Sequence, residues 1–224
     1  MMKEIYLIGG MNEETYQAFT DRMLATAEEV VSVYHPGKLW VTLTESPPPL
    51  VSIIPFKRGK LAAFSLFRKE GDGKEYSLLT SMTGFRFASR VEEAIPVNYE
   101  RNWPCGTVTP GICMLTLFRS RKDITQDVFI DRWHNSHTPL SLRIHPLWHY
   151  NRNVVTAQLG SGESGWDGIV EEHFKTRKDL LNPFLFFGNP LVIIPRMIEV
   201  YRDTNSFLEY KTIEPWLARE YHIS

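Results

Sequence analysis

Two stretches of the chain, Thr15-Tyr-Gln-Ala-Phe-Thr-Asp-Arg22 and Thr125-Gln-Asp-Val-Phe-Ile-Asp-Arg132, share four residues at matching positions. The shared threonine, phenylalanine, aspartate and arginine lie 110 positions apart in every case. A short alternating apolar run precedes each stretch, and the same offset places Ile5 and Leu7 on Leu115 and Leu117. Each copy therefore begins with a strand followed by a threonine-capped helix, which indicates a diluted internal repeat.

The order of the predicted elements supports the repeat. The first copy predicts strands at 3–8, 38–45, 60–68, 76–80 and 86–99 and a helix at 13–33. The second predicts strands at 111–119, 148–157, 166–174 and 215–222, and helices at 125–138, from 176 and at 195–204. Leu39-Trp40 and Leu147-Trp148 mark the second strand of each copy, at an offset of 108. The order β-α-β-β-α-β is that of a ferredoxin-like unit.

The fold class predicted from this order is α+β, with two ferredoxin-like units packed sheet to sheet. Residues 103–111 contain two prolines and two glycines, so we place the boundary there, with a degenerate unit at 1–106 and a second unit at 107–224. Helices cover only one face of such a sheet, and the second copy covers the other. We expect a ligand to sit in the space between the two sheets.

Charge and composition exclude several classes of partner. The 224 residues carry 25 basic and 26 acidic side chains, a net charge of -1, so no basic field favours nucleic acid or an anionic membrane. Cys105 and Cys113 match neither zinc-site nor redox-pair spacing and are predicted to be free thiols. The chain has no signal-like N-terminus and no apolar run of membrane-spanning length, so we expect a cytoplasmic protein.

The helix at 125–138 carries the residues best suited to chemistry. Phe129 and Trp133 form its apolar stripe, His137 lies on that stripe, and His134 flanks it. Pro139 is expected to end the helix and leave His137 in the last turn, where the helix dipole would raise the pKa of the imidazole. A histidine that titrates near neutrality is suited to proton transfer, although an inward histidine at a helix end also occurs as a purely structural residue.

Two alternatives for these histidines remain open. At the 110-residue offset the first copy has Leu24 and Ala27 in place of His134 and His137, which favours a functional role for the pair. His134 and His137 lie i, i+3 and would share a helix face, so a metal site is possible if His149, Glu171 or His173 supplies a third ligand. A haem with one axial histidine is the other alternative.

The next two predicted strands supply polar candidates whose orientation the sequence leaves open. Residues 148–155 place Tyr150 on one face and His149 and Asn151 on the other, and Tyr150 or Asn151 is a candidate oxyanion donor. Residues 166–174 place Asp167 and Glu171 on the face opposite the mostly apolar one. Such a row faces either solvent or a cavity.

The second half of the chain resembles an EthD-type domain. The resemblance rests on one helix motif and two strands and covers about residues 111–222: Phe129, Trp133, His137, Pro139, Leu140, Tyr150, Asp167-Gly168 and Glu171. Further residues are similar to the long bacterial form with two fused units: Arg90-Val-Glu-Glu, Tyr99, Trp103-Pro104 and Thr109-Pro110-Gly111. The resemblance implies a dimeric α+β barrel closed within one chain. Its superfamily includes cofactor-free monooxygenases, muconolactone isomerases, polyketide cyclases and dehydratases, and haem enzymes.

These observations predict a cofactor-independent enzyme that acts on a small apolar or aromatic metabolite by isomerase, dehydratase or lyase chemistry. The predicted catalytic residues are His137 as general acid and base, with Tyr150 and Asn151. The predicted substrate-binding residues are Phe129, Trp133, His134, His149, Asp167 and Glu171. No nucleophile is seen to pair with the base, and no metal or cofactor is expected. A non-catalytic binding protein and a haem or metal oxidoreductase are the alternatives. We expect a homodimer, joined through exposed aromatic residues such as the cluster at Phe184.

Overall fold

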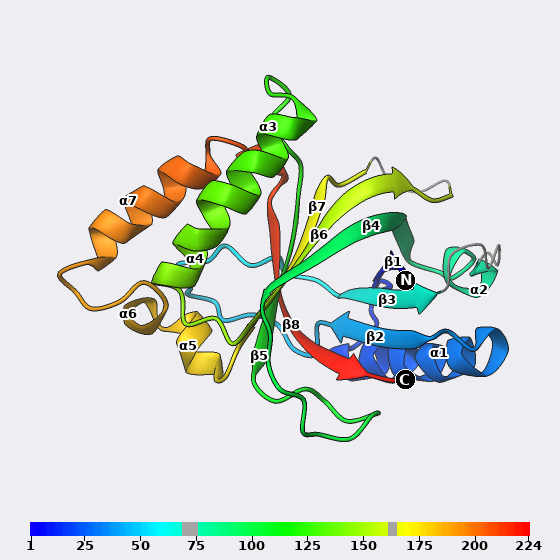
Figure 1. The fold of residues 1–224 in the computed structure, drawn as a ribbon. Helices are drawn as coiled ribbons and strands as arrows, with labels where there is room; N and C mark the ends of the chain where they lie inside the picture. Colours follow the sequence, from blue (N-terminus) through cyan, green and yellow to red (C-terminus); the bar gives the residue numbers. More distant parts are fainter. Residues whose placement is uncertain (69–75, 161–164) are drawn as a thin grey trace.

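The sheet of this protein closes on itself as a barrel. The computed structural model describes residues 1–68, 76–160 and 165–224. In these ranges the eight strands follow the order β1-β3-β2-β8-β5-β7-β6-β4 around the barrel, and every neighbouring pair is antiparallel (Figure 1). The strands are β1 (Met2–Gly9), β2 (Lys38–Leu43), β3 (Leu61–Arg68), β4 (Phe85–Val97), β5 (Ile112–Phe118), β6 (His149–Gln158), β7 (Gly168–Phe174) and β8 (Glu214–His222).

Each half of the barrel has the strand order of a ferredoxin-like sheet, β4-β1-β3-β2 in the first half and β8-β5-β7-β6 in the second. The halves join where β2 pairs with β8 and where β4 pairs with β6. The predicted fold class, two ferredoxin-like units forming an α+β barrel within one chain, is therefore confirmed.

The register of the strands corrects the alignment of the repeat. Trp40 lies opposite Ser65, Asn151 lies opposite Glu171, and Ser65 and Glu171 hold equivalent positions on β3 and β7. Trp40 therefore corresponds to Asn151, an offset of 111, and the offset of 108 predicted from the Leu-Trp pairs is wrong.

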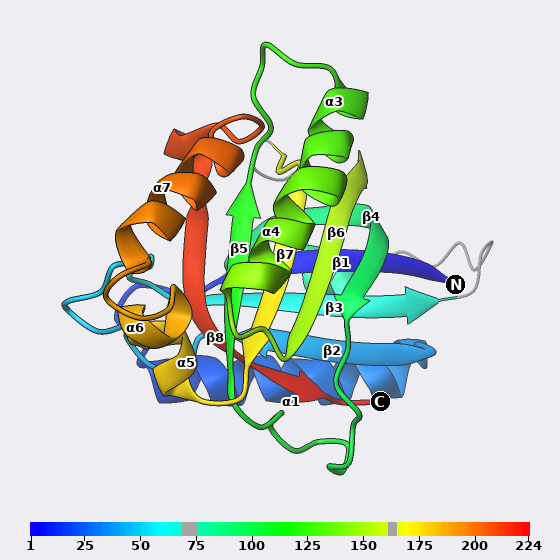
Figure 2. The ribbon, with the colours of Figure 1, turned by 60° about the vertical axis from the view of Figure 1, so that its left-hand side comes forward.

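The two sheets carry very different layers of helices on their outer faces (Figure 2). Helix α1 (Tyr16–Tyr34) covers the first sheet, and the described residues of that half add the single turn α2 (Ser77–Thr80), where a strand was predicted. The second sheet is covered by α3 (Gln126–Asp131), the π-helix η1 (Arg132–His137), α4 (Thr138–Ile144), α5 (Arg177–Leu181), α6 (Pro183–Phe186) and α7 (Ile193–Thr204). A 3-10 turn, η2 (Tyr210–Thr212), precedes β8.

The sequence predicted that the helix with the histidines ends at Pro139, and this prediction is wrong. It runs from α3 through η1 into α4, so His137 lies in its middle and not beside the negative end of its dipole. A proline inside a helix lacks an N–H and clashes with the carbonyl four residues earlier. The wide π turn absorbs this defect, because the N–H of Thr138 reaches the carbonyl of Trp133, five residues back.

The interior of the barrel is filled mainly by side chains and was predicted to hold the ligand. One end is an apolar cluster that includes Ile5, Leu7, Leu115, Leu117 and Trp216. The other end is polar, with the Lys3 ammonium 2.7 Å from the Glu93 carboxylate and Thr42 donating a 2.6 Å hydrogen bond to Glu171. The pocket described below lies outside the barrel, on the helix-covered face of the second sheet. It is therefore not in the space between the two sheets, where the sequence predicted the ligand.

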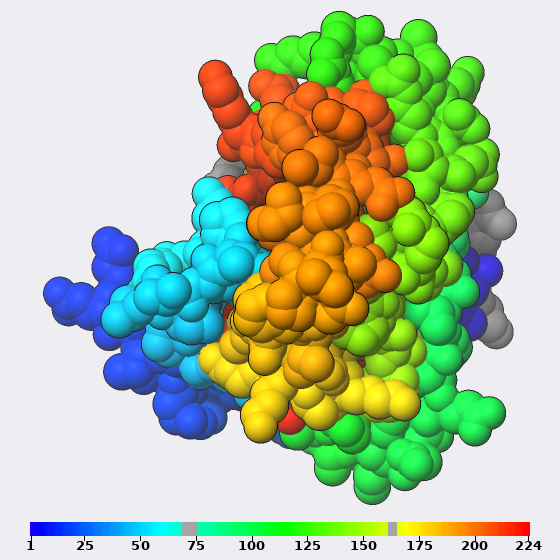
Figure 3. Space-filling view, turned by 90° about the vertical axis from the view of Figure 1, so that its left-hand side faces the viewer, coloured from blue at the N-terminus to red at the C-terminus, as the bar shows by residue number. Residues whose placement is uncertain are grey.

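Helices α6 and α7 form the face of the molecule shown in Figure 3, beside the loop that joins β2 to β3. Exposed apolar side chains on these two helices include Phe184, Leu185, Ile194, Ile198 and Tyr201. Among the described residues no helix has both the length and the apolar character needed to cross a bilayer.

Candidate active site

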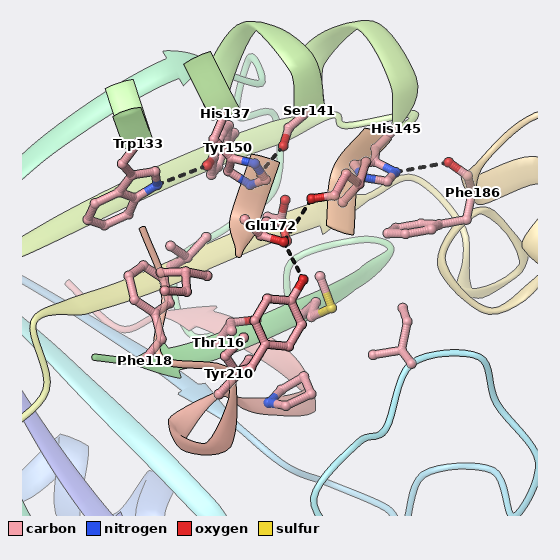
Figure 4. Close-up of a pocket in the computed structure, with 18 of the residues that line it drawn as sticks. Thr116, Phe118, Trp133, His137, Ser141, His145, Tyr150, Glu172, Phe186 and Tyr210 are labelled. Atoms are coloured by element: carbon pink, nitrogen blue, oxygen red, sulfur yellow. Dashed lines mark hydrogen bonds between the residues drawn. The ribbon is translucent and has the colours of Figure 1, made fainter. Parts of the chain in front are cut away.

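A pocket of about 290 Å³ lies between the outer face of the second sheet and its helices (Figure 4). Its floor comes from β5, β6 and β7, and its roof from η1, α4, α6 and α7. Ile54 and Pro55, from the loop between β2 and β3 of the first half, also line it. The lining is mostly apolar with a few polar groups, which is the character of a small-molecule site.

His137 is held in this pocket by partners on two other turns of helix. Its Nδ1 lies 2.7 Å from Oδ2 of Asp203 on α7, and its Nε2 lies 3.1 Å from Oγ of Ser141, one turn later on its own helix. Burial alone would raise the pKa of Asp203, but hydrogen bonds from His137 and Ser136 outweigh burial and lower it. An ionised Asp203 fixes the Nδ1–H tautomer and leaves Nε2 as the basic atom, as in other histidine–aspartate pairs.

Ser141 corrects the expectation that no nucleophile pairs with the base. Its side chain lines the pocket, and its hydroxyl, the His137 imidazole and the Asp203 carboxylate form a connected series. The connectivity is that of a serine–histidine–aspartate triad. Ser141 lies inside a helix, however, where its backbone carbonyl accepts from the N–H of His145, so the surrounding amides are engaged in the helix.

The floor of the pocket carries a buried carboxyl group. Glu172 on β7 is 7% exposed, and among the described residues nothing lies within hydrogen-bonding distance of its carboxyl. Burial is the sole cause of a shift that raises the pKa of Glu172 to about 7. Close by on β5, the buried Oγ1 of Thr116 also lacks a partner in this part of the chain.

Aromatic side chains form the walls around these groups. The indole of Trp133 donates a 3.4 Å hydrogen bond to the hydroxyl of Tyr150, which lies opposite Glu172 across β6 and β7. Burial and the neighbouring Glu172 raise the pKa of Tyr150 above its ordinary value. His145 stacks on Phe186, with ring centroids 4.0 Å apart, and burial lowers the pKa of His145 to about 4.

Three of the predicted site residues thus meet in this pocket: His137, Trp133 and Tyr150. Three others, His149, Asn151 and Glu171, lie on the opposite face of the sheet and point into the barrel. There Asn151 donates to Glu93, 2.8 Å away, so of the two candidate oxyanion donors only Tyr150 accompanies His137. Successive side chains of a strand point to opposite faces of the sheet, so Tyr150 faces the pocket while its neighbours His149 and Asn151 face the barrel interior.

The remaining predicted residues have structural surroundings. Asp167 accepts hydrogen bonds from the backbone N–H and the hydroxyl of Ser120, both at 2.8 Å. Phe129 is fully buried in the core beneath the helix. His134 packs against Trp133 outside the pocket lining, and burial lowers its pKa. Among the described residues no group of three or more His, Cys, Asp or Glu side chains is arranged to hold a metal ion.

Sequence reasoning missed Asp203, Ser141, Glu172 and Thr116. One of them had a readable signal, because Glu172 is the only charged residue on a strand face that otherwise reads Trp166, Gly168, Val170 and Phe174. Asp203 had none, since its approach to His137 depends on how α7 packs across the helix that carries the histidine.

Comparison with known proteins supports the fold. No protein-family model matches the chain, and no curated protein sequence matches it. The structure is similar to that of an anthrone oxidase-like protein, with a TM-score of 0.61 and 11% sequence identity over 100% of this chain and 91% of the other. It is also similar to a proposed monooxygenase from Fusobacterium nucleatum, with a TM-score of 0.53 and 6% identity over 100% of this chain and 92% of the other. At such low identity these likenesses establish the dimeric α+β barrel fold alone.

Proposed function

We propose that this protein is an enzyme that moves a proton on a small, largely apolar cyclic molecule bound between the second sheet and its helices. The observation that carries the proposal is the His137–Asp203 pair in an apolar pocket, with Nδ1 and Oδ2 2.7 Å apart. Nε2 of His137 is the general base. The Ser141 hydroxyl beside it either relays the proton from the substrate to Nε2 or rotates away so that the substrate contacts Nε2 directly. The reaction class we propose is isomerase, dehydratase or lyase.

Exchange of an acidic C–H proton tests this without knowledge of the natural substrate. We choose 2-tetralone, a fused-ring ketone, because one structural neighbour is an anthrone oxidase-like protein. We expect the protein to catalyse exchange of the C1 protons of 2-tetralone for deuterium in D2O, which NMR follows as loss of the C1 proton signal. His137→Ala should slow the catalysed exchange by about 100-fold or more, which is the usual contribution of a positioned base.

Two control variants bracket that result. His134→Ala removes the neighbouring histidine outside the pocket and should leave exchange unchanged. Thr116→Tyr fills the pocket floor and should abolish it. Binding of 2-tetralone with equal exchange in the wild type and His137→Ala would refute the base and support the alternative of a non-catalytic binding protein.

A second candidate function rests on the Ser141–His137–Asp203 series, whose geometry would also suit acyl transfer through Ser141. Ser141 lies inside α4, where backbone amides serve the helix, so Tyr150 or Thr116 of the pocket would donate to the oxyanion instead. Ser141→Ala distinguishes the two, because it would abolish p-nitrophenyl acetate hydrolysis but retain proton exchange to within a few-fold.

A further inference from the structure

The polar groups on the pocket floor have no role in the proton transfer just described. Glu172 and Thr116 project from neighbouring strands, since Thr116 pairs with Val170 and Glu172 pairs with Met114, all on the face turned to the helices. The Oγ1 of Thr116 is buried without a partner among the described residues, and a partner from a ligand would relieve a cost of about 1–3 kcal/mol. The position of both groups below His137 and Ser141 makes them the polar end of the ligand space (Figure 4).

The charges around Glu172 decide what kind of ligand group fits there. Among the described residues no lysine or arginine lines the pocket, and its titratable lining residues besides Glu172 are His137, His145, Tyr150 and Tyr210. Arg152 lies on the same face of β6 as Tyr150, outside the lining, and donates a hydrogen bond to Thr138. His145 is uncharged near neutrality because burial lowers its pKa to about 4, and the pKa of Tyr150 is raised. A carboxyl with no cation beside it keeps its proton more readily and can then donate a hydrogen bond.

We propose that Glu172 and Thr116 form an oxygen-binding subsite in which the carboxylic acid of Glu172 donates a hydrogen bond to the carbonyl oxygen of an uncharged ketone. The inference rests on the proposed function, because it assigns the substrate of the His137 base to compounds with a C–H bond next to that carbonyl. Thr116 adds a second hydroxyl to the same oxygen. Carboxylates and phosphates are disfavoured, since the pocket offers them no cation and an acidic neighbour.

The step balances without any external reactant. The C–H bond beside the carbonyl breaks, and its proton passes to Nε2 of His137. Its electron pair becomes the C=C bond of an enolate, whose oxygen accepts the hydrogen bond from Glu172 more strongly than the ketone did. Where the substrate carries a C=C bond beside the deprotonated carbon, the enolate is a dienolate, and return of the proton from Nε2 to the far carbon of that bond shifts the double bond and completes an isomerisation.

Three probes with one ring system test the subsite by binding alone: 2-tetralone, tetralin and tetralin-2-carboxylate. In the wild type at pH 6 the ketone is expected to bind at least tenfold more tightly than tetralin, and the carboxylate more weakly than either. Glu172→Leu, which keeps the volume but removes the donor, should bring the ketone-to-tetralin ratio near one. Glu172→Gln keeps an N–H donor and should retain the preference.

A pH series adds a readout that a purely structural glutamate would not move. In the wild type the ketone preference should fall between pH 6 and pH 9, as Glu172 loses its proton, whereas in Glu172→Gln it should stay constant. An unchanged ratio in Glu172→Leu, or tightest binding of the carboxylate, would overturn the subsite. If the wild type catalyses His137-dependent proton exchange but binds the ketone and tetralin about equally, the subsite alone is overturned. If it binds the ketone tenfold more tightly than tetralin but catalyses no exchange, the proton-transfer function alone is overturned.

Discussion

The two halves of the barrel share a strand order, yet the layers between sheet and helix are opposites. In the first half this layer is a packed, largely apolar core that includes Tyr6, Ala27, Leu39 and Leu66, with the Glu4–Arg68 ion pair at its edge. At the corresponding positions the second half has Thr116, His137, Tyr150 and Glu172, all of which line the pocket. The comparison shows that one sheet frame supports either a packed core or a site, according to a handful of side chains.

The helices explain why the layer between sheet and helix holds a pocket in the second half. Helix α1 lies directly on the first sheet and buries Phe19, Met23 and Val30 completely. In the second half η1, α4, α6 and α7 together cover the outer face of the sheet. The segments between β7 and β8, which include α6 and α7, enclose the space that a single helix fills in the first half. In the first half, the described part of the corresponding connection, residues 76–84, contains the single turn α2.

The largest expected effect comes from moving the buried acid into the packed half. Leu66→Glu places a carboxyl at the position equivalent to Glu172 but in a packed layer and directly opposite the buried Glu4, so it should lower the free energy of unfolding by about 4 kcal/mol, through lost packing and the burial of a second carboxyl beside the first. Urea unfolding at pH 8 measures this. The reciprocal Glu172→Leu should raise stability under the same conditions. A cost below about 1 kcal/mol for Leu66→Glu would show that the first layer is not a packed core.

An intermediate effect is expected from pH acting on Glu172 itself. Its carboxyl ionises at about 4.5 in the unfolded chain and at about 7 in the fold, so unfolding releases a proton between these values. The contribution of Glu172 to the free energy of unfolding is therefore fully present below pH 4.5. It falls by up to about 3 kcal/mol as the pH rises to 7. Glu172→Gln should lack this loss.

The difference between wild type and Glu172→Gln is the quantity to measure across this range. His145 and His149 titrate in the opposite sense, because burial lowers their pKa values to about 4 and about 3, and folding then gains stability as the pH rises toward 6.5. These terms are common to both proteins and cancel in the difference. A difference that stays constant from pH 4.5 to pH 7 would show that Glu172 is ionised in the fold.

Strand and helix patterns predicted the two-unit fold because each depends on local periodicity and caps. The site was predicted only in part, since His137, Trp133 and Tyr150 share a pocket that the sequence placed on the wrong side of the sheet. Parity separates Tyr150 from Asn151 but does not say which face meets the helices. The π turn before Pro139 and the pairing of His137 with Asp203 arise from tertiary packing, which periodicity does not contain.

The smallest expected effect tests where the halves are still alike. Thr15 and Thr125 cap their helices in the same way, accepting hydrogen bonds from the N–H groups of Ala18 at 3.1 Å and Val128 at 3.4 Å. Thr15→Ala and Thr125→Ala should each lower the free energy of unfolding by about 1 kcal/mol, the usual value of such a cap. Chemical unfolding of both variants checks this, and only Thr125→Ala should also weaken 2-tetralone binding, because its helix continues into η1 and α4, which roof the pocket of the candidate site. Equal effects on binding would mean that the ligand is not held under the helix of the second half.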